Sequence, residues 1–134
     1  MTGERDLQKL IVSMEPTLDA EAYVFASVPA DFSFAETPLM RFREDEGDTV
    51  ILSVSAANRA GLSDDRRFKR ITLNVHSCLE AVGLTAAFAE KLTAHDISAN
   101  VVAGFYHDHI FVPIQDAEAA LAALRSLSRD AASD

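Results

Sequence analysis

Apolar residues follow two spacings along the chain, one typical of helices and one typical of strands. Near the N-terminus, one apolar stripe at helical spacing is formed by Leu7, Leu10, Ile11 and Met14. Two later stripes at helical spacing are formed by Leu84, Phe88 and Leu92, and by Ala120, Leu121, Leu124 and Leu127. Helices are expected over residues 7–14, 55–60, 84–94 and 117–127. Residues that favour strands lie between them, and strands are expected over 22–28, 40–43, 49–54, 68–75, 97–105 and 109–113. The pattern predicts mixed α and β structure.

Capping residues indicate where several of these helices begin and end. Ser55 is the expected N-cap of the short helix and Gly61 its stop, and Asp116 is the expected N-cap of the last helix. An irregular turn over residues 77–82 is expected before the helix that follows Gly83. The tail from Ser128 onward is expected to fray.

The order of elements indicates the fold class. The second part of the chain reads as strand, helix, strand, strand, helix, which is most of a ferredoxin-like unit. The first part looks like a similar unit with elements shifted or shortened, and residues 29–38 are expected to be irregular. A polar connector over residues 62–67 marks the expected boundary, which gives units of residues 1–66 and 67–134.

Composition restricts the classes of partner. The formal net charge is −9, so most of the surface would repel a phosphate backbone, and nucleic-acid binding is disfavoured. No apolar run reaches the roughly 20 residues needed to cross a bilayer, and the N-terminus lacks the apolar segment of a signal peptide. The single cysteine, Cys78, excludes an internal disulfide. Together these features predict a cytoplasmic protein that does not bind membranes.

The first candidate site is the turn that leads into the helix after Gly83. A helix N-terminus presents unpaired backbone N–H groups and the positive end of the helix dipole, and it binds carboxylates or phosphates readily. Gly83 removes the side chain that would block close approach, and Ser77 and Thr85 add hydroxyl groups. In the alternative interpretation, Gly83 allows close packing of helix and strand, and Ser77 is only a cap.

Two further groups of polar residues lie on the strands that follow. Asn100 is an amide among apolar neighbours, which could hold a ligand's amino or carboxylate group, face solvent or bond to the backbone. His107 and His109 flank Asp108 at a predicted hairpin. They could bridge a metal with help from His76 or Glu80, contact an anionic ligand or a second subunit, or simply form a polar hairpin tip.

Two weaker candidates complete the set. Cys78 near a helix N-terminus could have a lowered pKa and be activated by His76, but no third orienting group is evident, so catalysis is disfavoured. The acidic turn formed by Glu44, Asp45 and Glu46 could attract an ammonium group, although such a run is usually only solvated.

Several motifs carry a family resemblance. The segments LEAVGLTAAFAEKL and ISANVVAGFYHDHIFVP resemble those of small bacterial ACT-domain proteins, and LIVSMEP, YVFASV and FREDEGDTVIL in the first half are similar to motifs of the same family. The resemblance covers residues 7–127. It implies α+β, ferredoxin-like architecture: tandem ACT-like βαββαβ units with antiparallel sheets and helices on one face, similar to the paired ACT modules of aspartokinases and arginine sensors.

The resemblance also implies a ligand and its position. In such modules an amino acid lies at the junction between units, held by the turn after the first strand. Carried onto this chain, the ligand-binding residues are Ser77, Val82, Gly83, Leu84, Thr85 and Asn100, with His107 and His109 in the family's hairpin. The second unit ends with a helix and lacks its closing strand. A strand from the first half must therefore fill that place, or the sheet stays shorter.

The sequence thus leads to one main hypothesis. The protein is a non-catalytic, amino-acid-binding regulatory or sensor module without a cofactor, expected to be a homodimer and to act on a regulated protein. The ligand's carboxylate would meet the backbone amides of residues 82–85, and its amino group would meet Asn100. The alternatives are a structural or interaction module with an empty ACT fold and, less favoured, an enzyme using Cys78 or a metal at His107 and His109.

Overall fold

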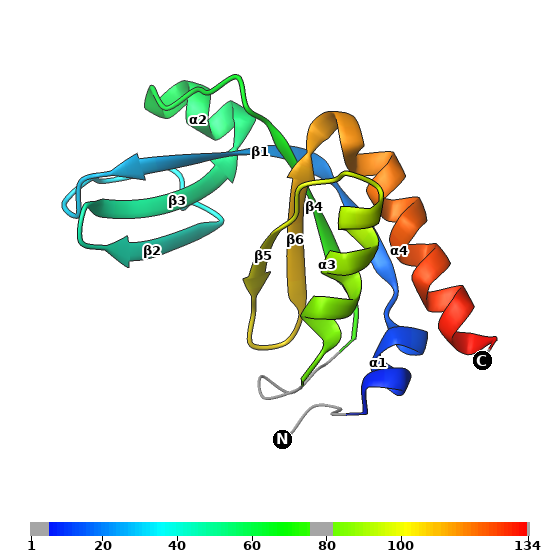
Figure 1. Cartoon of the computed structure of the whole chain (residues 1–134). Coiled ribbons are helices and arrows are strands. Elements are labelled where there is room, and N and C mark those ends of the chain that lie inside the picture. Colours follow the sequence, from blue (N-terminus) through cyan, green and yellow to red (C-terminus); the bar gives the residue numbers. More distant parts are fainter. Residues whose placement is uncertain (1–5, 76–81, 134) are drawn as a thin grey trace. The chain divides into compact units, whose positions relative to one another are not determined.

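The computed structural model describes residues 6–75 and 82–133 (Figure 1). Four α-helices, six strands and one short 3-10 helix are found in this part of the chain. In chain order they are α1 (Leu7–Ser13), β1 (Pro16–Val28), β2 (Met40–Glu44), β3 (Gly47–Ser53), α2 (Val54–Ala60), β4 (Phe68–Leu73), α3 (Leu84–Ala94), β5 (Asn100–Ala103), β6 (Asp108–Pro113), η1 (Ile114–Asp116) and α4 (Ala117–Ala132).

The strands are hydrogen-bonded in the order β2-β3-β1-β4-β6-β5. The pairs β1–β3, β2–β3 and β5–β6 are antiparallel. The chain divides into two compact units, one formed by Met1–Asp19 with Lys69–Asp134 and the other by Ala20–Phe68. We call them unit 1 and unit 2. The predicted α+β, ferredoxin-like fold class is confirmed.

Unit 1 contains the segment β4-α3-β5-β6-α4, with the start of β1 beside β4. That position is the one a closing fourth strand would take, so the expectation that a first-half strand fills it is confirmed. Asn74 fixes the pairing, because its backbone N–H and its side-chain Nδ2 both donate to the Glu15 carbonyl, and Nδ2 also donates to Thr17 Oγ1. Arg70 adds an ion pair with Asp19, with Nη2 to Oδ2 at 2.8 Å.

These contacts also explain why β1 is longer than expected. The pattern predicted a strand only over residues 22–28, because the preceding residues are mostly polar. In the structure β1 begins at Pro16, a residue tolerated at the first position of a strand. The bonds from Asn74 and Arg70 hold this polar segment extended, and they depend on residues more than fifty positions away.

The core of unit 1 lies between its helices and one face of β4 and β6. Figure 1 shows α3 and α4 on the same side of these strands, with α1 near the end of α4. The largest buried side chains of this cluster include Phe88, Leu92, Leu10, Ile71 and Leu124. Except for Ile71, which lies on β4, these residues are positions of the predicted helical stripes, so the helical spacing predicted the packed faces of the helices correctly.

The end of α4 differs from the prediction that the tail frays from Ser128. The helix continues to Ala132, because its last turns are held by α1. Ser128 Oγ donates to the Val12 carbonyl at 2.8 Å, and Gln8 Nε2 donates to the Ala131 carbonyl. Asp116 stands at the N-cap of this helix as predicted, although its side chain makes no capping hydrogen bond.

Strand β5 is shorter than the predicted strand over residues 97–105. Ile97 belongs instead to the end of α3, where its N–H donates to the Leu92 carbonyl and its side chain is buried in the core. Asp96 just before it adopts a left-handed conformation with φ of 58°. The end of α3 therefore includes Ile97, the first residue of the alternating pattern that predicted a strand.

Unit 2 contains β2, β3, the rest of β1 and α2. Its core is formed by Val24, Val28, Val50, Leu52 and Ala57, and Phe32 and Phe34 pack against it from the irregular segment 29–39. This segment stands where the first helix of a βαββα unit would be, so the expected shortening of the first unit has a structural basis.

The short helix in unit 2 begins earlier than predicted. Ser53, not Ser55, is the N-cap of α2, because its Oγ accepts from the Ala56 N–H at 3.2 Å. Ser55 lies within the first turn. Gly61 ends the helix with a left-handed φ of 74°, as predicted.

Candidate functional site

The predicted ligand-binding turn lies at the start of α3. Gly83 is the N-cap residue, with φ of 95° and ψ of −15°, and no side chain caps the helix. No acceptor for the N–H groups of Leu84, Thr85 and Ala86 is found within the described part of the chain. These amides, together with the helix dipole, give this end of α3 the character of an anion-binding position.

The side chains around Gly83 divide into exposed and buried ones. Val82 is 83% exposed and Thr85 is exposed, so both are accessible to a ligand. Leu84 is buried in the unit 1 core, so it can contribute only its backbone N–H. Ser77 lies outside the described residues, as do His76, Cys78 and Glu80.

The space beside Gly83 is partly taken by α1. A Cβ atom added to Gly83 would lie 3.0 Å from Cδ2 of Leu7, whose own side chain is on the surface edge of α1 and 36% exposed. The glycine thus allows close packing, which was the alternative interpretation from the sequence. Any ligand group at Gly83 would share this space with the Leu7 side chain.

Asn100 is the first residue of β5 and is exposed. Its Nδ2 donates to the carbonyl of Phe111, its cross-strand partner, at 3.3 Å. Its Oδ1 remains able to accept a hydrogen bond. Because β5 runs from Asn100 toward the β5–β6 hairpin, Asn100 lies at the far end of the strand from that turn. Its role in ligand binding stays a prediction.

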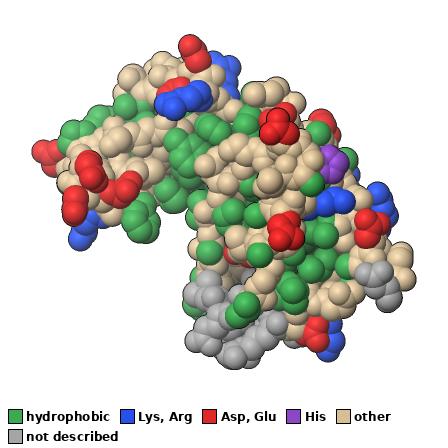
Figure 2. Space-filling view, in the orientation of Figure 1, with side chains coloured by type: hydrophobic (Ala, Val, Ile, Leu, Met, Phe, Trp, Pro, Cys, Tyr) green, Lys and Arg blue, Asp and Glu red, His purple; other side chains and the backbone are tan. Residues whose placement is uncertain are grey.

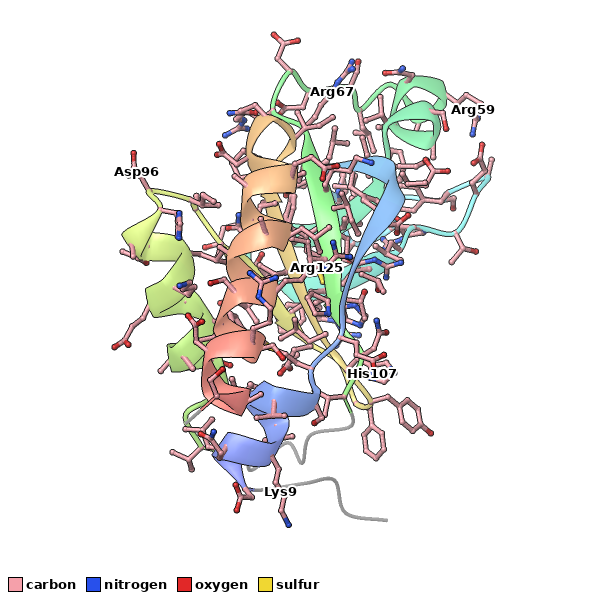
Figure 3. All side chains as sticks on the ribbon, turned by 90° about the vertical axis from the view of Figure 1, so that its right-hand side faces the viewer. Lys9, Arg59, Arg67, Asp96, His107 and Arg125 are labelled. Atoms are coloured by element: carbon pink, nitrogen blue, oxygen red, sulfur yellow. The ribbon has the colours of Figure 1, made fainter. Side chains whose placement is uncertain are left out.

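Of the hairpin histidines, His109 points toward β4 and His107 toward the residues just after it. His107 Nδ1 lies 3.3 Å from the Val75 carbonyl, and His109 Nδ1 lies 3.0 Å from Thr72 Oγ1. Figure 3 shows His107 at the end of the hairpin, on the same level as α1. Since β4 ends and α3 begins at this end of unit 1, the structure brings His107 to the end that carries Gly83.

The environment of the hairpin shifts two pKa values. Burial lowers the pKa of His109, and the positive charges of Arg70 and His107 lower it further. Burial raises the pKa of Asp108, against the opposing charge of His107. His109 is thereby favoured in its neutral form, as a hydrogen-bonding partner of Thr72 rather than as a cation.

Unit 2 contains an arginine network that the sequence did not indicate. Arg41 Nε donates to Asp48 Oδ2 at 2.7 Å, and its other nitrogens donate to the carbonyls of Phe32, Ala30 and Pro29. Its guanidinium carbon also lies 5.3 Å from the centre of the Phe34 ring. One side chain therefore fixes the irregular segment 29–34 to the strands.

A cavity of about 290 Å³ lies in unit 2 between this irregular segment and α2. Its apolar lining includes Phe32, Phe34 and Leu52, and an ion pair between Glu36 and Arg59 stands at its polar part. The sequence signal for it would have been the two phenylalanines in an otherwise irregular segment.

The acidic turn at the β2–β3 hairpin is a separate feature, and Figure 2 shows acidic side chains gathered over that end of the unit.

Two further observations concern metals and membranes. Among residues 6–75 and 82–133, no group of three or more His, Cys, Asp or Glu side chains is arranged to hold a metal ion. Every helix in the described part of the chain is too short or too polar to span a bilayer.

The fold defines a class of protein that is built from tandem ferredoxin-like units. An ACT-domain family model matches residues 2–69, and a second ACT-domain model matches residues 65–126. The chain belongs to the ACT-domain family. ACT domains typically bind small molecules and act in regulation, and they often dimerise.

Several solved structures have a similar fold. A Vibrio cholerae protein of unknown function, described as a possible transport protein, is 51% identical, with a TM-score of 0.76, over 87% of this chain and 91% of that one. A protein from Agrobacterium tumefaciens is 16% identical, with a TM-score of 0.62, over 81% of this chain and 84% of that one. The ligand-free regulatory subunit of aspartate kinase from Thermus thermophilus is 9% identical, with a TM-score of 0.57, over 86% of this chain and 98% of that one. No curated protein sequence matches the chain.

Proposed function

We propose that this protein is a non-catalytic regulatory or sensor module and that its ligand is an amino acid. The observation that carries the proposal is the start of α3 in an ACT-domain chain, where a left-handed glycine precedes a helix without a side-chain cap. A module of this kind needs no catalytic group, and the proposal includes none. In keeping with its family and its single cysteine, we expect a cytoplasmic homodimer that acts on another protein.

The ligand's carboxylate would accept hydrogen bonds from the backbone amides at the start of α3. A carboxylate there gains from charge-assisted hydrogen bonds and from the helix dipole. The exposed Thr85 hydroxyl is in the first turn and can add a further donor. His107 and His109 of the hairpin are additional proposed contacts. Asn100 is a proposed contact of the ligand's ammonium group, because its Oδ1 can accept a hydrogen bond from that group.

The test is calorimetry of the full chain against a panel of amino acids at millimolar concentration. Thr85→Glu places a negative charge in the first turn of α3, where it stabilises the helix but repels a ligand carboxylate. Binding should weaken by roughly tenfold or more, which corresponds to about 1.4 kcal/mol. Thr93→Glu adds the same charge to the other end of α3 and should leave binding unchanged. Equal affinity in both variants would exclude the α3 turn as the carboxylate site.

One observation favours a second candidate function, a protein-interaction module with an empty ACT fold. The Leu7 side chain lies against Gly83 and takes up space that a ligand would use. This candidate predicts that no amino acid binds to the full chain, nor to a Leu7→Ala variant in which that space is freed. Binding that becomes tighter in Leu7→Ala would instead favour the sensor.

A further inference from the structure

The cavity in unit 2 is walled by a segment that is held in place independently of any ligand. Phe32 and Phe34 contact each other with ring centroids 4.8 Å apart, and both pack against the unit 2 core. The backbone of this segment is held by Arg41, which donates to the Phe32 carbonyl at 3.0 Å and lies over the Phe34 ring. The apolar part of the cavity is therefore preformed, as small-molecule sites usually are.

The charged part of the cavity carries one positive and one negative group. Arg59 near the end of α2 donates from Nη2 and Nε to the two oxygens of Glu36, with 2.7 Å between Nη2 and Oε2 (Arg59 is labelled in Figure 3). The Arg59 side chain is 60% exposed and that of Glu36 is 49% exposed. Exposed pairs of this kind add little stability, so they can exchange partners at small cost.

A molecule with both charges would satisfy the two groups at once. Its carboxylate would accept two parallel hydrogen bonds from the guanidinium group of Arg59, which is the usual bidentate geometry of arginine with a carboxylate. Its ammonium group would take the carboxylate of Glu36. One ion pair would be replaced by two, while an apolar side chain would contact Phe32, Phe34 and Leu52.

We propose that this cavity is a second ligand site, which binds a small zwitterion with an apolar side chain, such as leucine or phenylalanine. The cavity of about 290 Å³ lies just below the usual volumes of ligand pockets, roughly 300–1,000 Å³, which suits one amino acid and excludes a nucleotide-sized ligand. The site is built from unit 2 residues alone and does not depend on the α3 turn.

The first test is a titration of the ¹⁵N-labelled full chain with L-leucine and L-phenylalanine to about 10 mM, followed by NMR. The amide signals of residues 32–36 and 56–60 should shift. Isopentylamine and 4-methylpentanoate each retain one charge of leucine and should bind more weakly. Absence of shifts in these two segments with both amino acids overturns the proposal.

Variants then locate the ligand within the cavity. Arg59→Gln removes the carboxylate partner and should weaken binding by roughly tenfold or more. Ala56→Leu fills the cavity from α2 with a good helix former and should abolish binding. The matched controls are Arg43→Gln on β2 and Asn58→Leu on α2, because neither residue lines the cavity. Unchanged affinity in Arg59→Gln, in a variant with a native-like spectrum, would overturn the assignment.

The same spectra separate this site from the proposed function. Shifts confined to residues 82–86 would support the α3 turn and overturn the unit 2 site. Shifts confined to residues 32–36 and 56–60, lost in Arg59→Gln but kept in Thr85→Glu, would support the unit 2 site alone. Shifts in both regions, each lost only with its own variant, would support two sites.

Discussion

Arg41→Ala should destabilise the protein, because it removes the counter-charge of the buried Asp48 carboxylate. Asp48 is only 7% exposed, and its Oδ2 accepts from Arg41 while its Oδ1 has no hydrogen-bond partner within the described part of the chain. Removing Arg41 would leave a buried carboxylate without its counter-charge. Breaking a fully buried pair costs about 3–5 kcal/mol.

The magnitude expected here lies below that range, because the pair is only partly buried. The Arg41 side chain is 30% exposed, so water already screens part of the interaction. The three carbonyls in segment 29–32 that accept from Arg41 are in exposed hydrogen bonds, and water can replace the lost donor. We therefore expect the free energy of unfolding to fall by about 2–3 kcal/mol.

The assay is urea denaturation followed by circular dichroism, with hydrogen exchange to locate the effect. Arg43→Ala is the matched control, because Arg43 is an exposed residue of the same strand, and it should change stability by less than about 0.5 kcal/mol. Arg41→Ala combined with Asp48→Ala should cost less than the sum of the single changes, since no unpaired charge remains. Amides of residues 29–36 should exchange faster in Arg41→Ala, while those of α3 should not change. If Arg41→Ala and Arg43→Ala have the same stability, the buried pair has no structural importance.

Two further predictions concern Gly83 and His109. Gly83→Ala should lower the free energy of unfolding by about 1–3 kcal/mol, because of the left-handed φ and the contact with Leu7. It should cost more than Gly61→Ala, because an added Cβ at Gly61 meets no atom within 4 Å. Adding Leu7→Ala to Gly83→Ala should recover part of the difference, and strict additivity of the two changes in denaturation midpoints would contradict the contact. Because burial and nearby positive charges lower the pKa of His109, protonation favours the unfolded state: stability should be complete above pH of about 6.5 and decline as pH falls through the folded-state pKa. His109→Gln should flatten that decline in urea midpoints measured across this pH range, and an unchanged slope would show that another group causes it.

The sequence predicted the elements whose stability depends on apolar spacing. The stripes of α1, α3 and α4 became the buried faces of unit 1, since a helix is stabilised mainly by burying one face. Gly61 was predicted as a helix stop for a local reason, the ease with which glycine adopts positive φ. Predictions of this kind depend only on residues that are close in sequence, so they can be made without knowing the rest of the fold.

The elements that were missed depend on partners far away in sequence. The start of β1 is polar and becomes a strand by pairing with β4, and side-chain bonds from Asn74 and Arg70 support this pairing. The Arg41 network was invisible for the same reason, since most of its acceptors are backbone carbonyls of an irregular segment. No spacing rule encodes such acceptors, because every residue carries a carbonyl.

The two βαββα segments differ most at the position of their first helix, and this difference explains where the sequence located chemistry. In the second segment that position is α3, and its start offers backbone amides next to Gly83, a feature that glycine and capping rules can indicate. In the first segment it is the irregular stretch held by Arg41, which offers an apolar wall and two opposite charges. Neither the apolar wall nor the pair of opposite charges follows from local conformation, so both could be recognised only in the folded structure. The duplication thus provides two chemically different environments, one suited to an anionic group and one to a zwitterion with an apolar side chain.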